Sequence, residues 1–388
     1  MILHRYIISL IFMFWCEMND LSAITHAPEF GTFNFITGDN GAGKTRFLTQ
    51  LARNTLDDLL EHKSKFNKLV CLTTTVYEKF PRPLRKNSEN IAFYEGVYSY
   101  FGGRVNNNVF SDISPFRTII KSYCGISEHN NAFSLVEQLM YELGFSSSIV
   151  CHFRDERWRE KNGRSNKNDK EIKIMLCRLA EYLYDSDREK IAKNELFLLD
   201  IKFRRLSDSK LYGIRDLSSG ERSFIITILS LAFSLKDKTL ILFDEPENSM
   251  HPKWQDKITS VIKLIVDNVS PNSVVVIATH SPLVVSSVSN DNVYTMNLPG
   301  DFIWEKSHHS GNNSDTVLKE QFGLVSSRSL NFVLKIQECI KLYTRGENEQ
   351  FVSEMDGLLG MEVIISNGDP LFEAYNTMID LYRRLKEQ

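Results

Sequence analysis

A glycine-rich segment that ends in lysine and threonine contains the residues of this 388-residue chain best suited to hold a triphosphate. Residues 38–45 read GDNGAGKT and match the phosphate-loop pattern GxxxxGK[ST]. Glycines let backbone N–H groups turn around phosphates, the lysine reaches the β- and γ-phosphates, and the threonine hydroxyl can ligate Mg²⁺. We assign nucleotide contacts to Gly38, Asn40, Gly41, Ala42, Gly43, Lys44, Thr45 and Arg46.

An acidic pair at the end of an apolar run supplies the complementary chemistry. Residues 240–246 read LILFDEP, which is typical of a buried strand that ends in two carboxylates. Beside a phosphate loop, Asp244 can ligate Mg²⁺ together with Thr45, and Glu245 can polarise the attacking water. An acidic pair after a strand is by itself typical of a surface turn, but its position downstream of the phosphate loop favours the catalytic role.

Two further motifs can contact a nucleotide. Residues 217–222 read LSSGER and precede a predicted helix, so a hydroxyl and backbone N–H groups can face an anion there. Residues 276–281 read VIATHS, which puts His280 just beyond a strand, where it can contact a γ-phosphate. By itself, the first motif is typical of a helix cap. By itself, His280 is typical of a polar residue whose hydrogen bonds are made within the protein. Together with Glu245, His280 is our candidate catalytic residue.

These motifs need a sheet and helices to position them. A strand over 33–37 and a helix over 44–60 flank the phosphate loop, as that loop requires. The other predicted elements of this region are strands at 69–74, 240–243 and 274–278 and a helix at 254–266. Strands that alternate with helices indicate an α/β fold with a parallel sheet.

The remaining segments are predicted to be mainly helical. Residues 115–194 carry apolar residues at helical spacing in two stretches, 135–145 and 172–184, separated by a polar segment at 159–170 that is predicted to be a solvated loop. The stretch 315–388 is predicted to form helices that are interrupted near Gly346, Gly360 and Gly368.

Along the chain, the four motifs follow the order phosphate loop, signature, DEP strand and switch histidine. In type and order they resemble the motifs of the ABC-type ATPases. The resemblance implies an α/β P-loop NTPase with a mixed sheet core, an inserted helical lobe and a C-terminal helical region. The implied bounds are 1–75 and 206–305 for the core, 76–205 for the lobe and 306–388 for the C-terminal region. The implied cofactors are ATP and Mg²⁺.

The resemblance also implies a second copy of the chain. In this family the signature of one subunit contacts the γ-phosphate bound to the other, which assigns that contact here to Ser218, Ser219, Gly220 and Glu221. A homodimer or a higher even oligomer is therefore expected. Residues 246–252, PENSMHP, look like the loop of the branch that includes the RecF, SMC and OLD ATPases, and this disfavours a transporter subunit.

The match departs from the family in two places. Ser219 stands where the commonest signature has glycine, as this branch often shows. No glutamine follows the 69–74 strand, where the family has one that touches magnesium and water. Either Gln138 does not align there, or another polar residue such as Thr75 substitutes. The property that this departure affects is the coupling of nucleotide to the helical lobe.

Residues 73–82, 244–252 and 314–323 look like the corresponding stretches of the PtuA ATPases of Septu antiphage systems, which work with a separate nuclease. This resemblance predicts the sensor or regulatory subunit of an antiphage complex with a nuclease effector. The alternative is a RecF-like DNA-repair or DNA-clamp ATPase, which would use basic segments that can also be read as solvated surface: Arg82, Arg85, Lys86, residues 154–173, Lys202, Arg204 and Arg205.

Composition limits the class of protein. A net charge of -3 disfavours a wholly basic nucleic-acid coat, and six scattered cysteines contain no zinc-binding spacing. The apolar stretch 7–16 is too short to span a bilayer, so it is predicted to form core strands, with a membrane-associated N-terminus as the alternative. We expect a cytoplasmic protein without a membrane partner.

Overall fold

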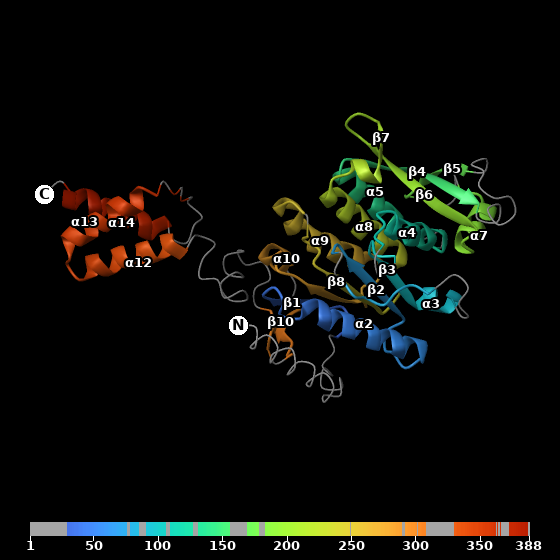
Figure 1. Ribbon diagram of the computed structural model, residues 1–388, viewed down its shortest axis with the longest axis horizontal. Coiled ribbons are helices and arrows are strands. Elements are labelled where there is room, and N and C mark those ends of the chain that lie inside the picture. Colours follow the sequence, from blue (N-terminus) through green and yellow to red (C-terminus); the bar gives the residue numbers. More distant parts are fainter. Residues whose placement is uncertain are drawn as a thin grey trace. The chain divides into compact units, whose positions relative to one another are not determined.

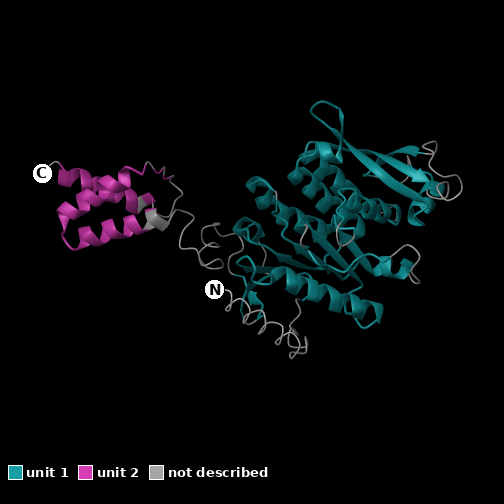
Figure 2. Cartoon of the chain, in the orientation of Figure 1, with its two compact units in different colours: residues 1–314 teal, residues 315–388 magenta. Residues whose placement is uncertain are grey.

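The structure is a computed structural model that divides the chain into two compact units, residues 1–314 and 315–388 (Figure 2). It describes residues 29–75, 78–84, 91–105, 109–126, 131–155, 169–177, 183–248, 250–288, 292–300, 302–307, 330–361, 363, 365 and 372–386. Three predicted segments lie outside these ranges: the apolar stretch 7–16, most of the loop at 159–170, and the stretch 314–323.

A sheet of seven described strands forms the centre of unit 1, and its order is β11-β10-β1-β9-β8-β2-β3. All neighbouring pairs are parallel except β10 and β11, so the sheet is mixed as expected. The strands are β1 (Phe33–Gly38), β2 (Lys68–Thr73), β3 (Tyr98–Phe101), β8 (Thr239–Asp244), β9 (Val274–Ala278), β10 (Val293–Leu298) and β11 (Glu305–Lys306). Because β3 pairs with β2, the sheet continues beyond residue 75.

The central strands are continuous apolar runs because helices cover both faces of the sheet. Every residue of β2, β8 and β9 is buried, which is the pattern of a parallel sheet between two helical layers. Helix α2 (Lys44–Leu60) packs its apolar stripe on one face, and α8 (Ser219–Ser234) and α9 (Pro252–Val269) lie on the other (Figure 1). The predicted helices at 44–60 and 254–266 are therefore confirmed.

Helix α8 is buried along most of its length. Its residues Phe224 to Ser234 are nearly all inaccessible, which suits a helix that is apolar on most sides. Around it in unit 1 pack α4 (Ser114–Cys124), α5 (Ala132–Glu142) and α9. The shorter helices of the unit are α3 (Ile91–Val97), α7 (Asp185–Ala192), η2 (Ile214–Asp216) and α10 (Pro282–Ser286).

The lobe inserted between β3 and α8 contains a second sheet, and this corrects the prediction of a mainly helical lobe. An antiparallel sheet in the order β5-β4-β6-β7 is formed by β4 (Phe145–Asp155), β5 (Asp169–Met175), β6 (Leu196–Arg205) and β7 (Leu211–Gly213). The helix predicted over 135–145 is confirmed as α5 up to Glu142, whereas Phe145 begins β4. The helix predicted over 172–184 is wrong at its start, because Ile172 and Ile174 are buried while Lys173 is exposed, and this alternation is that of a strand.

Unit 2 is helical where it is described, in agreement with the prediction. Helices α12 (Leu330–Thr344), α13 (Asn348–Leu359) and α14 (Phe372–Lys386) pack around a core of their own. Gly346 and Gly360 lie between or next to these helices, as expected, while Gly368 falls outside the described residues. No helix in the described part of the chain is long and apolar enough to cross a membrane.

Candidate nucleotide-binding site

Three neighbouring strands bring the predicted motifs to one edge of the sheet. Strand β9 lies between β1 and β8, with Ile36 and Asp244 both in register with Ala278. The phosphate loop follows β1, the acidic pair ends β8, and His280 follows β9. Because the carboxyl ends of parallel strands share an edge, residues far apart in the sequence meet here, where ligands of open α/β sheets bind.

The phosphate loop has the backbone shape that its glycines predict. Gly41 and Gly43 adopt positive φ angles of 81° and 102°, and Gly43 precedes α2 without a side-chain cap. The first N–H groups of α2 are thus left for an anion at the positive end of the helix dipole. Ala42 closes the turn by donating its N–H to Asp39 O at 3.2 Å, while Asn40 and Arg46 are exposed.

The lysine of the loop is buried and held in place by backbone oxygens. Lys44 Nζ donates to the carbonyl oxygens of Gly38 and Asp39 at 2.7 and 3.0 Å. It also lies 3.1 Å from His280 Nδ1. Burial lowers the pKa of Lys44, and the nearby carboxylates of Glu245, Glu247 and Asp244 partly offset this effect.

The two predicted magnesium ligands contact each other. The Thr45 hydroxyl lies 3.0 Å from both carboxylate oxygens of Asp244. Burial raises the pKa of Asp244 to about 7, although the hydrogen bond from Thr45 opposes the change. A buried carboxylate beside a hydroxyl is a donor set that suits Mg²⁺, which retains waters or phosphate oxygens at its other positions.

The arrangement therefore fits the cation that the motif implies. Within the described residues no group of three or more His, Cys, Asp or Glu side chains could hold a metal ion by itself. A hard cation held by one carboxylate and one hydroxyl needs oxygens from a bound phosphate to complete its coordination. Metal and nucleotide would therefore bind as a pair at this edge.

The two candidate catalytic residues also contact each other. His280 Nε2 lies 3.3 Å from Glu245 Oε1. Since His280 Nδ1 faces the Lys44 ammonium, it must accept, and the ring proton belongs on Nε2, toward Glu245. This hydrogen bond lowers the pKa of Glu245, so the carboxylate stays ionised and can accept a proton.

Glu245 also has an unusual backbone. Its φ of 51° is in the left-handed region, which is uncommon for a residue with a Cβ. The conformation is stabilised on both sides, since Glu245 N donates to Ala278 O at 2.9 Å and the Thr74 hydroxyl donates to Glu245 O at 2.5 Å. Strain of this kind persists where surrounding contacts enforce it, often at functional sites.

Sequence reasoning missed two residues of the site. Glu247 is half-buried, and its Oε1 accepts from the Thr279 hydroxyl at 2.7 Å and from the His280 N–H at 2.6 Å. It therefore ties the loop after β8 to the loop after β9 and orients His280. Thr74 was missed because Thr75 was the expected substitute for the family's glutamine. Gln138 lies on α5 and donates to Glu142, as its lack of alignment implied.

The signature residues form a helix cap within their own chain. Ser218 caps α8, with its hydroxyl 3.2 Å from Glu221 N, and Ser219 and Gly220 begin the helix. The Glu221 carboxylate accepts from Ser218 N at 2.9 Å and from Arg205 at 2.8 Å. Although burial raises the pKa of Glu221, these hydrogen bonds outweigh it, and the pKa falls below its ordinary value. The site therefore assembles the phosphate loop, acidic pair and histidine in one chain, and α8 presents the signature separately.

This site lies in a chain that belongs to an ATPase family. A family model described as "AAA domain, putative AbiEii toxin, Type IV TA system" matches residues 67–286, more than half of the chain. The chain is a member of that family, with an α/β fold whose parallel sheet core is mixed at one edge. The matched range contains the acidic pair, the signature and His280, and the phosphate loop precedes it.

Two curated relatives match parts of the chain, and one of them is named as a probable ATPase. The chain is 23% identical over 237 residues to "Retron Vc95 probable ATPase" of Vibrio cholerae, covering 55% of this chain and 45% of that protein. It is 35% identical over 156 residues to protein ea59 of Escherichia phage lambda, covering 38% of this chain and 28% of that protein. The chain thus spans less than half the length of these relatives.

Two solved structures share a low overall similarity with the chain. One is the SmcHead bound to the C-winged helix domain of ScpA, with a TM-score of 0.37 and 12% identity, covering 72% of this chain and 90% of that one. The other is UvrA2 from Deinococcus radiodurans, with a TM-score of 0.29 and 15% identity, covering 77% of this chain and 36% of that one. Scores this low support no conclusion about this protein.

Proposed function

We propose that the protein binds ATP with Mg²⁺ and hydrolyses it in an ABC-type dimer, in which two copies hold nucleotide between them. The observation that carries this proposal is the convergence of Lys44, Thr45, Asp244, Glu245 and His280 at one sheet edge, each within hydrogen-bond reach of another. Membership of an ATPase family supports the nucleotide, and the cap motif of α8 supports the dimer.

Each residue has a role that follows from its surroundings. The N–H groups of the phosphate loop and Lys44 would hold the triphosphate, and Thr45 and Asp244 would hold the Mg²⁺, which supplies charge neutralisation when bound. The ionised Glu245 takes a proton from the attacking water, since its pKa is lowered. His280, oriented through its backbone N–H by Glu247, donates a hydrogen bond from Nε2 to Glu245 and can donate it instead to a phosphate oxygen.

The dimer follows from the position of the signature at the start of a long helix. Ser218 and the N–H groups of the first turn of α8 form a positive helix end that suits an anion. Because the Glu221 carboxylate is held by Ser218 and Arg205, it fixes the shape of this end. We propose that this end meets the γ-phosphate held by the phosphate loop of a second copy.

A mixing experiment tests the shared site. The Lys44→Ala chain retains its signature, and the Ser218→Arg chain retains its phosphate loop, so each is expected to be inactive alone. Mixed dimers contain one intact site made from both chains, so a mixture of equal parts should regain roughly a quarter of the parent ATP turnover. Phosphate release measures this regain.

The matched control combines two substitutions that both damage the phosphate-loop side of the shared site. Mixing Lys44→Ala with Glu245→Gln leaves each phosphate-loop half defective in every dimer, so no turnover should return. Recovery in the control as well, or no recovery in the test mixture despite mixed dimers in native mass spectrometry, contradicts the shared site. Binding of ATP by the Ser218→Arg chain, followed by calorimetry, separates a failed dimer from a failed nucleotide pocket.

For the biological role, we propose the sensor or regulatory subunit of an antiphage complex that acts with a separate nuclease. Two observations support it: the family is named for a toxin of a type IV TA system, and the relatives include a retron ATPase and a phage protein. The resemblance of three stretches to PtuA supports a nuclease partner. We expect a co-purified nuclease to change the rate of ATP turnover. Duplex DNA should leave that rate unaltered.

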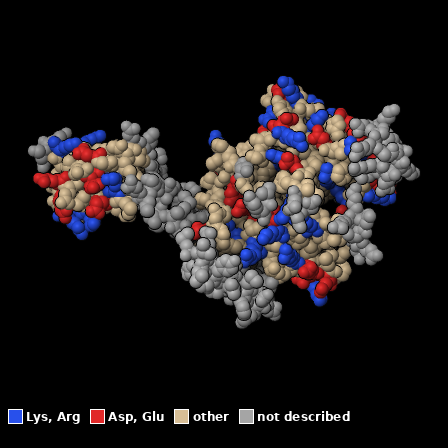
Figure 3. Space-filling model, viewed as in Figure 1, with Lys and Arg blue, Asp and Glu red and all other residues tan. Residues whose placement is uncertain are grey.

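The alternative function, a DNA clamp of the RecF type, predicts a different result in that assay. Of the basic residues considered for it, Arg204 donates to Ser209 O, Arg205 pairs with Glu221, and Arg154 pairs with Asp169. On the face shown in Figure 3, basic and acidic side chains are interleaved over the antiparallel sheet. DNA-stimulated turnover that falls steeply with salt would favour the clamp over the defence regulator.

A further inference from the structure

A cavity of about 560 Å³ opens at the edge of the main sheet opposite the nucleotide site. Its lining includes Lys68, the first residue of β2, and Lys236, which precedes β8. Strand β2 ends at Thr73, in register with Asp244, so a full strand separates the cavity from the catalytic edge. That strand spans about 17 Å, and the volume is in the range of small-molecule sites.

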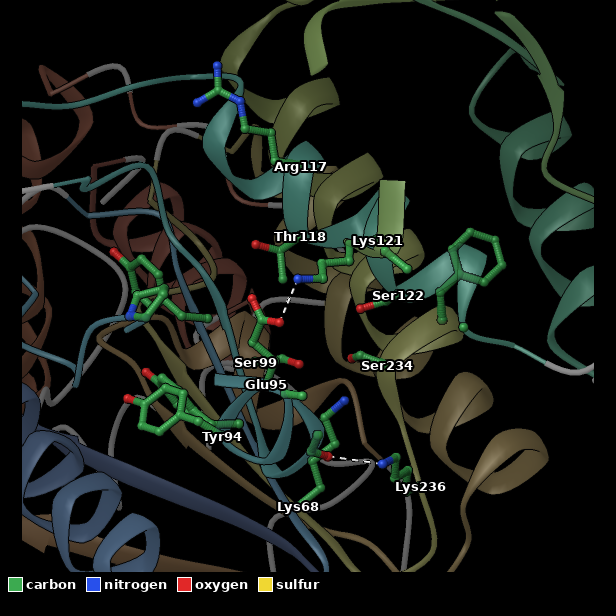
Figure 4. Close-up of a pocket in the computed structure, with 18 of the residues that line it drawn as sticks. Lys68, Tyr94, Glu95, Ser99, Arg117, Thr118, Lys121, Ser122, Ser234 and Lys236 are labelled. Carbon is green, nitrogen blue, oxygen red and sulfur yellow. Dashed lines mark hydrogen bonds and ion pairs between the residues drawn. The ribbon is translucent and has the colours of Figure 1, made fainter. Parts of the chain in front are cut away.

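The charge of this cavity is strongly unbalanced. Its charged lining residues are one acid, Glu95, and four bases, Lys68, Arg117, Lys121 and Lys236. Glu95 pairs with Lys121 at 2.5 Å, and Lys236 donates to Gly96 O at 2.9 Å. Figure 4 shows Lys68 and Lys236 beside each other at one end of the cavity, with Lys121 and Arg117 toward the other end. An occupant would therefore meet a net positive site.

Lys68 is the residue that most needs a counter-charge. It is 5% exposed, and no side chain or carbonyl of the described residues accepts a hydrogen bond from its ammonium or pairs with it. Burial lowers the pKa of Lys68 to about 7, and the like charge of Lys236 lowers it further. An ammonium on a side chain this little exposed is poorly hydrated, and an anion in the cavity that it lines would stabilise its charge.

The rest of the lining suits a small phosphate-bearing molecule. Within the described residues, the hydroxyls of Ser99, Thr118 and Ser122 have no hydrogen-bond partner, so they can donate to phosphate oxygens. The hydroxyls of Tyr94 and Tyr98 donate to the carbonyl oxygens of Arg82 and Pro81, which leaves their rings as the apolar wall. Ammonium groups, short hydroxyls and aromatic rings together match a phosphate attached to an organic body.

We propose that this cavity, at the amino ends of β2 and β8, binds a small phosphate-bearing molecule whose phosphate contacts Lys68 and Lys236. The site is separate from the proposed ATP site and does not depend on it. The charged and titratable groups that line the cavity together with Lys68 are Lys236, Lys121, Arg117, Glu95, Tyr94, Tyr98 and Tyr100. Of these, only Glu95 is an acid, and it is already paired.

Calorimetry on the full chain tests the proposal, with Lys44→Ala as the background so that the phosphate loop does not contribute. The probes are inorganic phosphate, pyrophosphate and glucose 6-phosphate, which distinguish a bare anion site from one that also uses the tyrosine wall. Lys68→Met and Lys236→Met should each raise the Kd about tenfold or more, the effect of one lost charge-assisted hydrogen bond. Lys257→Met, an exposed lysine of α9, is the control and should not change it.

Proton uptake gives a second readout that a merely structural role of Lys68 would not produce. At about pH 8 the Lys68 amine is mainly neutral in the free cavity, and a bound anion raises its pKa, so binding should take up close to one proton. Calorimetry in two buffers of different ionisation enthalpy measures this uptake, which should vanish in Lys68→Met. No binding of any probe at millimolar concentration, or the same Kd in all three variants, would overturn the proposal.

Discussion

Replacing Lys68 by methionine should stabilise the protein, and by an amount that depends on pH. In the unfolded chain this lysine has its ordinary pKa of 10.5, whereas burial lowers the pKa to about 7 in the folded chain. Between these values the unfolded state binds more protons, so the lysine makes stability rise with pH. The methionine fills the same space without a proton to bind, and the rise that Lys68 causes should disappear.

The size of the effect follows from the two pKa values. At about pH 6 the shift costs the folded state about 5 kcal/mol, because the lysine is charged in both states. At about pH 9 the folded amine is neutral, and the cost falls to about 2 kcal/mol. The gain in unfolding free energy from Lys68→Met should therefore be about 3 kcal/mol larger at the lower pH. Packing differences between the two side chains cancel in this comparison.

Urea unfolding followed by tryptophan fluorescence measures the two gains. All four tryptophans lie before residue 315, so the signal reports unit 1 alone. Equal slopes with denaturant in both proteins are needed for the free energies to be compared. Lys257→Met serves as the control and should give the same small change at both pH values. A gain from Lys68→Met that is equal at both pH values would show that Lys68 is not a buried, pairless amine.

Four further substitutions test the nucleotide site. Glu245→Gln should keep ATP binding but lower phosphate release by about a hundredfold or more, with dimers accumulating in light scattering, and normal turnover would refute the role of Glu245. Lys44→Ala should abolish ATP binding in calorimetry while leaving the urea midpoint close to that of the parent. Gly38→Ala should cost about 2 kcal/mol or more in urea unfolding, because its Cβ would lie 2.0 Å from Leu298 O at a φ of 132°, whereas Gly41→Ala, which meets open space, should cost about 1 kcal/mol.

Much of the nucleotide edge could be predicted from the sequence because each of its parts is a short contiguous motif. GDNGAGKT carries its own strand and helix, and the acidic pair and His280 each end an apolar run. Their meeting in space follows from parallel strands that share a carboxyl edge. The pair of His280 with Glu245 and the contact of Thr45 with Asp244 are consistent with those predictions.

The parts that the sequence could not supply depend on contacts between distant segments. Glu247 orients His280, which lies 33 residues further along the chain, and nothing in residues 244–252, DEPENSMHP, predicts that the third carboxylate makes this contact. In the lobe, residues 172–176 read IKIML and fit both a helical and an alternating pattern, and only pairing with β4 selects the strand. The Lys68 cavity combines β2, α3, α4 and the end of α8, so no local pattern marks it.

One end of α8 lines that cavity and the other end carries the signature. An occupant of the cavity should therefore act on the nucleotide site more through α8 than through β2. Across the roughly 17 Å of β2, one charge changes the energy of another by only about 1 kcal/mol at the effective dielectric constant of a protein. Helix α8 is different, because Ser234 near its end lines the cavity, while Ser218 caps its start about 24 Å away. Because α8 is closely packed along most of its length, we expect a displacement at Ser234 to be transmitted to the cap. We therefore expect an occupant of the cavity to alter the affinity of one copy for its twin before it alters nucleotide binding within a copy.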